Sequence, residues 1–174
     1  ALTDTTWYRR IVGSGPCADT SNIVRIAVTP ALANNTISAS QNICFQQTPN
    51  ALAGATPTGG SGTFSYLWQQ SNDSTTWVSA TGANTGVNYT PPSLTDTVYY
   101  RRRVLSATCT TFSNIVKIAV KPLPVVDFGA TTVCYPNTTT FSDSATASAG
   151  NTITNWLWSF GDGTTSTSQN PTKV

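Results

Sequence analysis

The sequence predicts an all-β protein built from β-sandwich domains in tandem, and three observations lead to this fold class. A stretch of the chain recurs at an offset of 92 residues, which indicates repeated domains. Several short segments alternate apolar and polar residues with the period of two that is typical of strands. No segment sustains the 3.6-residue period of an amphipathic helix.

The repeat divides the chain. Residues 1–30 align with residues 93–122 without a gap, and 18 of the 30 positions are identical. A unit of 92 residues is the size of one immunoglobulin-like sandwich. Both copies end in a proline, Pro30 and Pro122, which restricts the backbone and should make each joint stiff. We therefore expect the C-terminal part of one repeat at 1–30, a complete repeat at 31–122, and the N-terminal part of a further domain at 123–174.

The strands of the complete repeat can be predicted individually. Residues 98–104 and 114–120 are rich in β-branched and aromatic residues and flank a short polar loop, which predicts a hairpin. Residues 63–68 alternate with period two after a glycine-rich turn, and Trp68 in this segment is expected in the core between the sheets. Residues 87–90 predict a further short strand.

Composition excludes several classes of protein. Charged residues are only 9% of the chain, against roughly 25% in ordinary soluble domains, and 18 Ser and 32 Thr take their place. The composition argues against a disordered chain, because 39% of the residues are apolar and five are Trp. The net charge of +2 predicts no nucleic-acid partner. No apolar run approaches the ~20 residues that cross a bilayer.

Enzyme chemistry is not expected. The chain has no His, which excludes Ser-His-Asp and Cys-His arrangements and imidazole metal sites. The seven acidic residues are all Asp, and most lie beside turn residues, where their oxygens bind local backbone. We predict no catalytic, cofactor-binding or metal-binding residues. A calcium site is the alternative, because extracellular sandwiches often bind calcium through oxygen ligands, but no loop concentrates three acids.

Two surface features are candidate binding elements. Trp77 follows a polar turn and is a candidate ligand-contact aromatic, the alternative being that it caps the core. In Arg101-Arg102-Arg103, strand alternation places Arg102 on the face opposite its neighbours, so no face carries three charges. We expect the long arginine stems to cover sheet edges and to pair with Asp96.

The four cysteines follow the repeat, with one early and one late in each unit. This spacing predicts one disulfide per unit in an oxidising compartment, here Cys44–Cys109, with Cys17 and Cys134 unpaired. Four free thiols and a bond between neighbouring units are the alternatives.

Residues 1–122 resemble the Ig-like repeats of giant Bacteroidota surface proteins, which include the mobile adhesins of gliding bacteria. The motifs that carry the resemblance occur in order along the chain: Ile43-Cys44, Gly59-Gly60-Ser61-Gly62, Tyr66-Leu67-Trp68-Gln69, Thr76-Trp77, Leu94-Thr95-Asp96-Thr97, Tyr99-Tyr100-Arg101-Arg102, Cys109 and Ser113-Asn114-Ile115-Val116.

Residues 123–174 resemble a PKD domain through the segment Trp156–Ser166, which contains Phe160-Gly161-Asp162-Gly163, and through Gln169-Asn170-Pro171. Asp162-Gly163 predicts a tight hairpin turn, with Trp158 and Phe160 on one strand face. Lys173 departs from the family pattern, which has a His or an aromatic residue near this position. The expected fold is thus a series of immunoglobulin-like β-sandwiches followed by a truncated PKD-type β-sandwich.

These resemblances imply a secreted protein of the cell surface, exported by the type IX system and associated with the outer membrane only through regions outside this segment. They also imply O-glycosylation of Ser or Thr after Asp. The candidate sites are Thr5, Ser74, Thr97 and Ser144.

We expect a structural and adhesive stalk segment that acts in cell-surface adhesion and gliding motility. Its partners would be neighbouring repeats of the same chain and a surface polysaccharide or other extracellular ligand bound through distal regions. The alternative is a spacer or carbohydrate-binding module of a secreted polysaccharide-degrading enzyme, and a third reading is a domain of a secreted protease.

Overall fold

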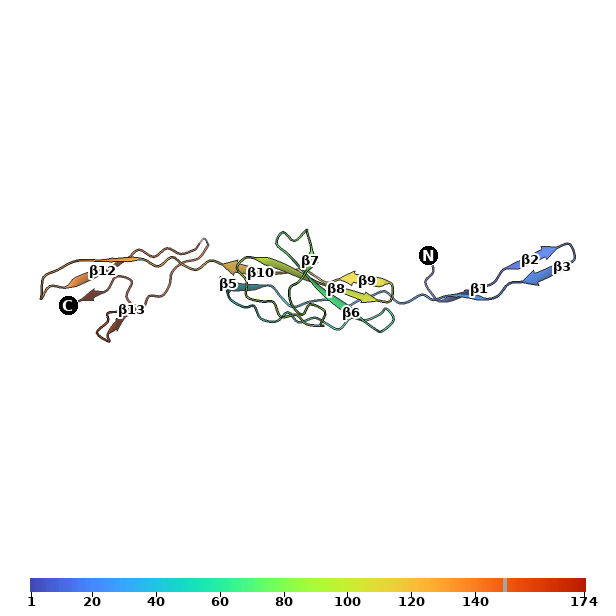
Figure 1. The fold of residues 1–174 in the computed structure, drawn as a ribbon, viewed down its shortest axis with the longest axis horizontal. Helices are drawn as coiled ribbons and strands as arrows, with labels where there is room; N and C mark the ends of the chain where they lie inside the picture. The colour runs from blue at the N-terminus through green and yellow to red at the C-terminus, as the bar shows by residue number, and fades with distance from the viewer. Residues whose placement is uncertain (149) are drawn as a thin grey trace. The chain divides into compact units, whose positions relative to one another are not determined.

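The computed structural model describes residues 1–148 and 150–174, and this part of the chain contains strands and no helix. The predicted all-β fold class is confirmed. The chain forms two compact units, one of residues 1–41 with 46–119 and one of residues 42–45 with 120–174. Figure 1 shows the strands of both units, coloured from blue at the N-terminus to red at the C-terminus.

A long antiparallel hairpin forms the N-terminal part of the first unit (blue in Figure 1). Strand β1 pairs with β4, and β2 pairs with β3. Between the two pairs, the Arg10 N–H donates to Oγ of Ser21 and the Ser21 N–H donates to the Arg10 carbonyl, each at 2.8 Å. The two chain segments therefore stay hydrogen-bonded between the β1–β4 pair and the β2–β3 pair. The bounds are β1 Thr6–Tyr8, β2 Ile11–Ser14, β3 Cys17–Thr20 and β4 Val24–Ile26.

The central repeat is built on one six-stranded sheet, with order β5-β10-β8-β6-β7 and β9 paired with β8. Its longest strand, β8, alternates buried and less buried residues along its length, as a strand with one covered face must. The predicted pairing of residues 98–104 with residues 114–120 is confirmed by β8 and β10, but part of the loop expected between them forms β9, which also pairs with β8. The bounds are β5 Gln41–Cys44, β6 Ser65–Ser71, β7 Val78–Ser79, β8 Val98–Ser106, β9 Cys109–Phe112 and β10 Val116–Lys121.

The core lies on one face of this sheet. Trp68 is fully buried, as predicted, and stacks on Tyr89 with ring centroids 5.6 Å apart, while Tyr89 contacts Tyr100 at 5.5 Å. The segments that cover this face pair mainly through isolated bridges, such as Leu52 with Tyr89. The strand expected at residues 87–90 is reduced to that bridge. Two prolines follow it directly and lack the N–H groups that would extend a ladder.

Arg102 is buried in this core with no exposed surface. Its Nε and Nη2 donate to Oδ1 of Asn35 at 3.1 and 3.0 Å, and its other bonds go to the carbonyls of Ala55 (2.6 Å) and Val87 (2.8 Å). These acceptors belong to segments that are separated by tens of residues. The guanidinium therefore ties the irregular covering layer to the sheet.

The pairing expected between the arginines and Asp96 is wrong for Arg102, because neutral oxygens satisfy its donors inside the core. The Asp96 carboxylate instead accepts from Oγ1 of Thr95 at 2.9 Å. Gly54 makes the arrangement sterically feasible, since a Cβ at this position would collide with the Arg102 guanidinium.

The second unit contains a small sheet of order β11-β12-β15 and a separate hairpin of β13 and β14. The rings of Trp158 and Phe160 lie 5.6 and 5.3 Å from the ring of Phe141, so the expected common face is confirmed, as is the turn at Asp162-Gly163 between the paired strands. Lys173 forms an ion pair of 2.8 Å with Asp162. The bounds are β11 Phe128–Ala130, β12 Thr139–Asp143, β13 Trp158–Ser159, β14 Thr165–Ser166 and β15 Thr172–Lys173.

The predicted Cys44–Cys109 disulfide is not formed, and no disulfide joins the cysteines of the described chain. Gln46, two residues after Cys44, donates its N–H to the carbonyl of Leu94, which precedes β8. Cys109 pairs with Ser106 at the other end of that strand. The nine residues of β8, at about 3.3 Å each, separate these positions, whereas a disulfide needs Cα atoms within about 7 Å. Sequence spacing alone could not show that the cysteines lie at opposite ends of the sheet.

Candidate binding surface

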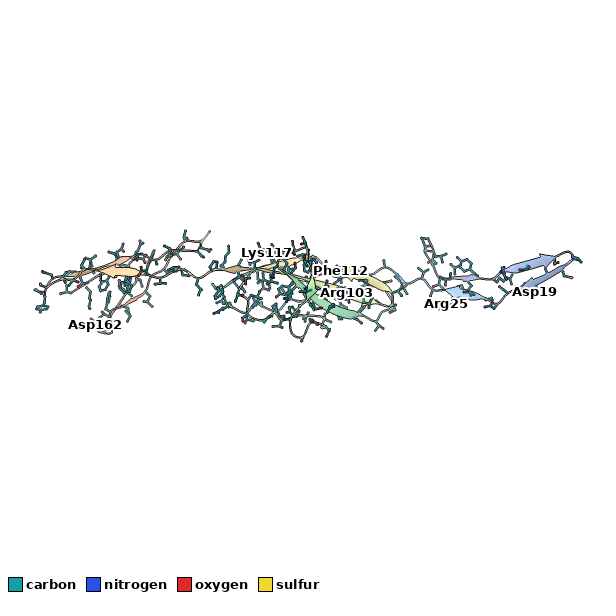
Figure 2. All side chains as sticks on the ribbon, turned by 45° about the horizontal axis from the view of Figure 1, so that its top comes forward. Asp19, Arg25, Arg103, Phe112, Lys117 and Asp162 are labelled. Atoms are coloured by element: carbon teal, nitrogen blue, oxygen red, sulfur yellow. The ribbon has the colours of Figure 1, made fainter. Side chains whose placement is uncertain are left out.

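The face of the central sheet that points away from the core carries a row of cationic and aromatic side chains. Alternation along β8 places Tyr99, Arg101 and Arg103 on this face, because Arg102 between them points into the core. The strand register sets Phe112 of β9 opposite Arg103 and Lys117 of β10 opposite Tyr99. We call these residues, together with Gln69 and Trp77, the outer-face cluster. Figure 2 labels Arg103, Phe112 and Lys117 of this cluster.

Arg101 has the closest ring contacts of the cations in the cluster. Its guanidinium carbon lies 4.2 Å from the ring centroid of Trp77 and 4.3 Å from that of Phe112, and its Nε donates to Oε1 of Gln69 at 2.9 Å. Ring faces attract cations electrostatically, so both contacts hold the guanidinium in place. Partial burial under the rings lowers the pKa of Arg101, although arginine remains charged at any physiological pH.

A weaker cation–ring contact recurs in both copies of the repeat. Nζ of Lys117 lies 5.9 Å from the ring centroid of Tyr99, and the guanidinium carbon of Arg25 lies 5.9 Å from the ring centroid of Trp7. The pairs occupy equivalent positions, since both are cross-strand partners in the two hairpins. A cation therefore lies near an aromatic ring at this position in both copies, although the residue types differ.

The strands of the outer-face cluster carry no carboxylate. The sequences of β6 to β10 contain no Asp, and the chain has no Glu. In the described part of the chain, none of Arg101, Arg103 and Lys117 forms an ion pair. The strands of the cluster therefore supply no carboxylate partner for these positive charges.

Sequence reasoning found one member of the cluster and missed its neighbours. Trp77, singled out as a ligand-contact candidate, is half-buried and lies against Arg101. The arginine run was interpreted as covering sheet edges. The alternation of Tyr99, Arg101 and Arg103 was the available signal, but the part played by Phe112 depends on the β8–β9 register, which no local pattern reveals.

A hollow of about 370 Å³ lies beside the cluster, between β6 and β7, and Asp73 lines it. Oδ1 of Asp73 accepts from the N–H groups of Thr76 (2.7 Å) and Thr75 (2.8 Å) and from Oγ of Ser71 (2.8 Å). These bonds, above all the backbone bond from Thr76, hold the pKa of the Asp73 carboxyl well below its ordinary value. The carboxylate organises its own turn.

The second unit has a larger cavity, of about 420 Å³, with mainly aromatic and aliphatic walls that include Phe128, Trp156 and Trp158. Asp143 lines one side. Its carboxylate accepts from the Ala145 N–H at 3.0 Å and from Nε1 of Trp156 at 2.8 Å, and these bonds lower its pKa. A carboxylate bound to an indole and a backbone amide stabilises the loop around it.

The four candidate glycosylation sites differ in exposure. Ser144 is exposed, whereas Thr5, Ser74 and Thr97 are half-buried. Oγ1 of Thr5 accepts from the Val28 N–H at 3.1 Å. Ser144 therefore offers the most accessible hydroxyl of the four.

Metal and membrane features can be stated for the described residues. No three Cys or Asp side chains in residues 1–148 and 150–174 come together as a metal site would require. Over the same residues, the structure has no helix with the length and hydropathy needed to cross a bilayer.

Comparisons with known families give matches over residues 33–174. A family model described as a domain of unknown function, DUF8696, matches residues 33–122, and a PKD domain model matches residues 121–174. The comparison with curated proteins gives no match. The PKD match fits a region of PKD and Ig-like repeats and indicates an extracellular module of structural or adhesive type.

Proposed function

We propose that this chain, which belongs to the DUF8696 family, is a structural and adhesive stalk segment of a large secreted bacterial surface protein. The DUF8696 model matches residues 33–122, and a PKD domain model matches residues 121–174. In the proposed role the chain has no catalytic activity. Its domains hold a distal binding region away from the cell, and strand hydrogen bonds within each domain resist extension.

The repeated hairpin is the observation that supports a stalk. The β1–β4 pairing of Thr6 with Ile26 recurs as the pairing of Val98 with Ile118, at the same offset of 92 residues as the sequence repeat. Units that repeat in this way form linear arrays. We propose that residues 1–30 are the C-terminal part of one repeat, residues 31–122 a complete one, and residues 123–174 the N-terminal part of the PKD domain.

The finer assignment comes from the family resemblance. The protein would be a Bacteroidota adhesin, exported by the type IX system, associated with the outer membrane through other regions and active in gliding motility. Thr5, Ser74, Thr97 and Ser144 would be its O-glycosylation sites. The mass of the intact protein from its native source tests this last point, since an unmodified mass would refute the four sites together.

Single-molecule stretching tests the stalk. When the chain is pulled from its two ends, we expect a resolvable force peak followed by a length gain of about 300 Å, which corresponds to the 92 residues of the repeat at about 3.3 Å each. A smooth extension curve without this peak would show that the repeat does not resist force and would overturn the mechanical role.

The second candidate is a spacer or carbohydrate-binding module of a secreted polysaccharide-degrading enzyme. The partly exposed Trp77 and Phe112, on either side of Arg101, favour it. The sequence that adjoins this segment distinguishes the candidates: further repeats support the stalk, and a glycoside hydrolase domain supports the enzyme.

A further inference from the structure

We propose that the outer-face cluster of the central repeat is a binding site for acidic polysaccharide, with Arg101 as the residue that contacts the carboxylates of uronic acid units. The ligand class rests on the proposed extracellular role. The contact residues are Gln69, Trp77, Arg101, Arg103, Phe112 and Lys117.

Arg101 is preorganised for a ligand. The rings of Trp77 and Phe112 and the amide of Gln69 all contact its guanidinium, so little side-chain entropy is lost when it meets a ligand. The guanidinium is a planar fork that matches a carboxylate in two parallel hydrogen bonds. Its bond to Gln69 uses Nε and does not occupy the two terminal nitrogens that would make these bonds.

The cluster also concentrates positive charge. Arg101 and Arg103 lie two residues apart on one strand, a spacing of about 7 Å, and Lys117 lies two strand positions from Arg101 on the neighbouring strand. No carboxylate occurs in β6 to β10 to balance them. A polymer with regularly spaced carboxylates could therefore meet several cations at once, whereas a neutral polymer would leave them without partners.

The net charge and the aromatic rings favour a saccharide over a nucleic acid. Nucleic-acid affinity depends on many phosphate contacts and on a strongly basic domain, and this chain has a net charge of only +2. A uronic acid combines a planar carboxylate with an apolar ring face. The cluster offers the matching pair, a guanidinium flanked by partly exposed aromatic rings.

Affinity electrophoresis of the full chain in gels that contain polygalacturonate, neutral dextran or single-stranded DNA tests the proposal. We expect retardation by polygalacturonate alone. Arg101→Gln and Arg101→Lys should each weaken this binding by about tenfold or more, because both remove the planar fork. Arg9→Gln is the matched control: Arg9 aligns with Arg101, but Thr20 occupies the position of Phe112 in its hairpin. This variant should bind as the parent does.

Three results would overturn the proposal. They are equal retardation by dextran and polygalacturonate, stronger retardation by DNA at physiological salt, and equal losses in the Arg9 and Arg101 variants. Thermal unfolding of each variant confirms that the repeat is folded, and Phe112→Thr, which copies the first hairpin, gives a second variant if Arg101→Gln is unstable. A negative binding result would leave the force peak of the stalk unchanged, so the two proposals fail separately.

Discussion

The hairpin of residues 6–26 and the hairpin of residues 98–118 have the same strand register, yet one is exposed and the other forms the wall of a core. Tyr8 pairs with Val24 as Tyr100 pairs with Val116. The same hydrogen bond from an arginine N–H to a serine Oγ also occurs in both hairpins. It joins Arg10 to Ser21 at 2.8 Å in the first and Arg102 to Ser113 at 2.8 Å in the second. Local sequence is therefore sufficient for the hairpin geometry.

Burial separates the two hairpins. Tyr8 is 45% exposed where Tyr100 is 1% exposed, and Ile26 is 45% exposed where Ile118 is fully buried. The difference arises from the intervening residues 31–97, which supply the covering segments and Trp68. A hairpin can thus be specified locally while its stability depends on residues far away in the sequence.

The identities between the copies fall on the core-facing side. Of the seven buried residues of the second hairpin, six are unchanged in the first, and only Val98 differs, as Thr6. The opposite face varies more, with Trp7 for Tyr99 and Ile11 for Arg103. The first hairpin therefore retains the residues that would fit the same covering layer. The six shared residues are Tyr100, Arg102, Val104, Ser106, Val116 and Ile118.

The largest expected effect comes from supplying that layer. Because Ser93 aligns with Ala1, a second copy of residues 31–92 placed directly before Ala1 should form a second complete sandwich. We expect the amides of residues 6–26 to gain hydrogen-exchange protection equivalent to about 5 kcal/mol or more, the stability of a small domain. The same extension with Trp68 of the added copy replaced by Ala is the control. If the amides of residues 6–26 still exchange fast when the added copy keeps its Trp68, the comparison is contradicted.

The next effect is that of the buried arginine. Arg102→Ala removes four hydrogen bonds and leaves Oδ1 of Asn35 without these donors inside the core, so we expect a loss of about 3–5 kcal/mol in the free energy of unfolding. Arg10→Ala, at the equivalent exposed position, should change it by less than about 0.5 kcal/mol. Urea denaturation followed by Trp fluorescence measures both, and equal effects would contradict the comparison.

A core substitution should have a somewhat smaller effect. Ile118→Ala leaves a cavity in a fully buried position and is expected to cost about 3 kcal/mol, whereas Ile26→Ala at its exposed counterpart should cost little. Chemical denaturation of this matched pair gives the contribution of the covering layer at one position. A cost of Ile26→Ala comparable to that of Ile118→Ala would show that the first hairpin is covered in solution.

The smallest effect is a dependence on pH. Burial raises the pKa of Tyr100 above its ordinary value of about 10, so the folded chain keeps a proton that the unfolded chain releases. Stability should consequently be unaffected below pH 10 and fall as the pH rises above it, by about 1 kcal/mol at pH 11. Tyr100→Phe should reduce this fall, and Tyr8→Phe should not. The pH dependence of the denaturation midpoint provides the measurement.

Part of this molecule can be predicted from the chain alone because the relevant signals are local. The 92-residue repeat, the hairpin of β8 and β10, the buried position of Trp68 and the turn at Asp162-Gly163 all depend on periodicity or turn chemistry within a few residues. Strand alternation also placed Arg102 correctly on the face opposite Arg101 and Arg103.

Only the tertiary structure decided the features that join distant segments. The partners of Arg102 are Asn35, Ala55 and Val87, whose positions depend on how the covering layer packs. Cys44 and Cys109 follow the repeat in sequence but lie toward opposite ends of β8. The outer-face cluster likewise forms where β6, β8, β9 and β10 meet with Trp77. A sequence pattern specifies the face on which a residue lies, whereas its partner on that face is set by long-range pairing.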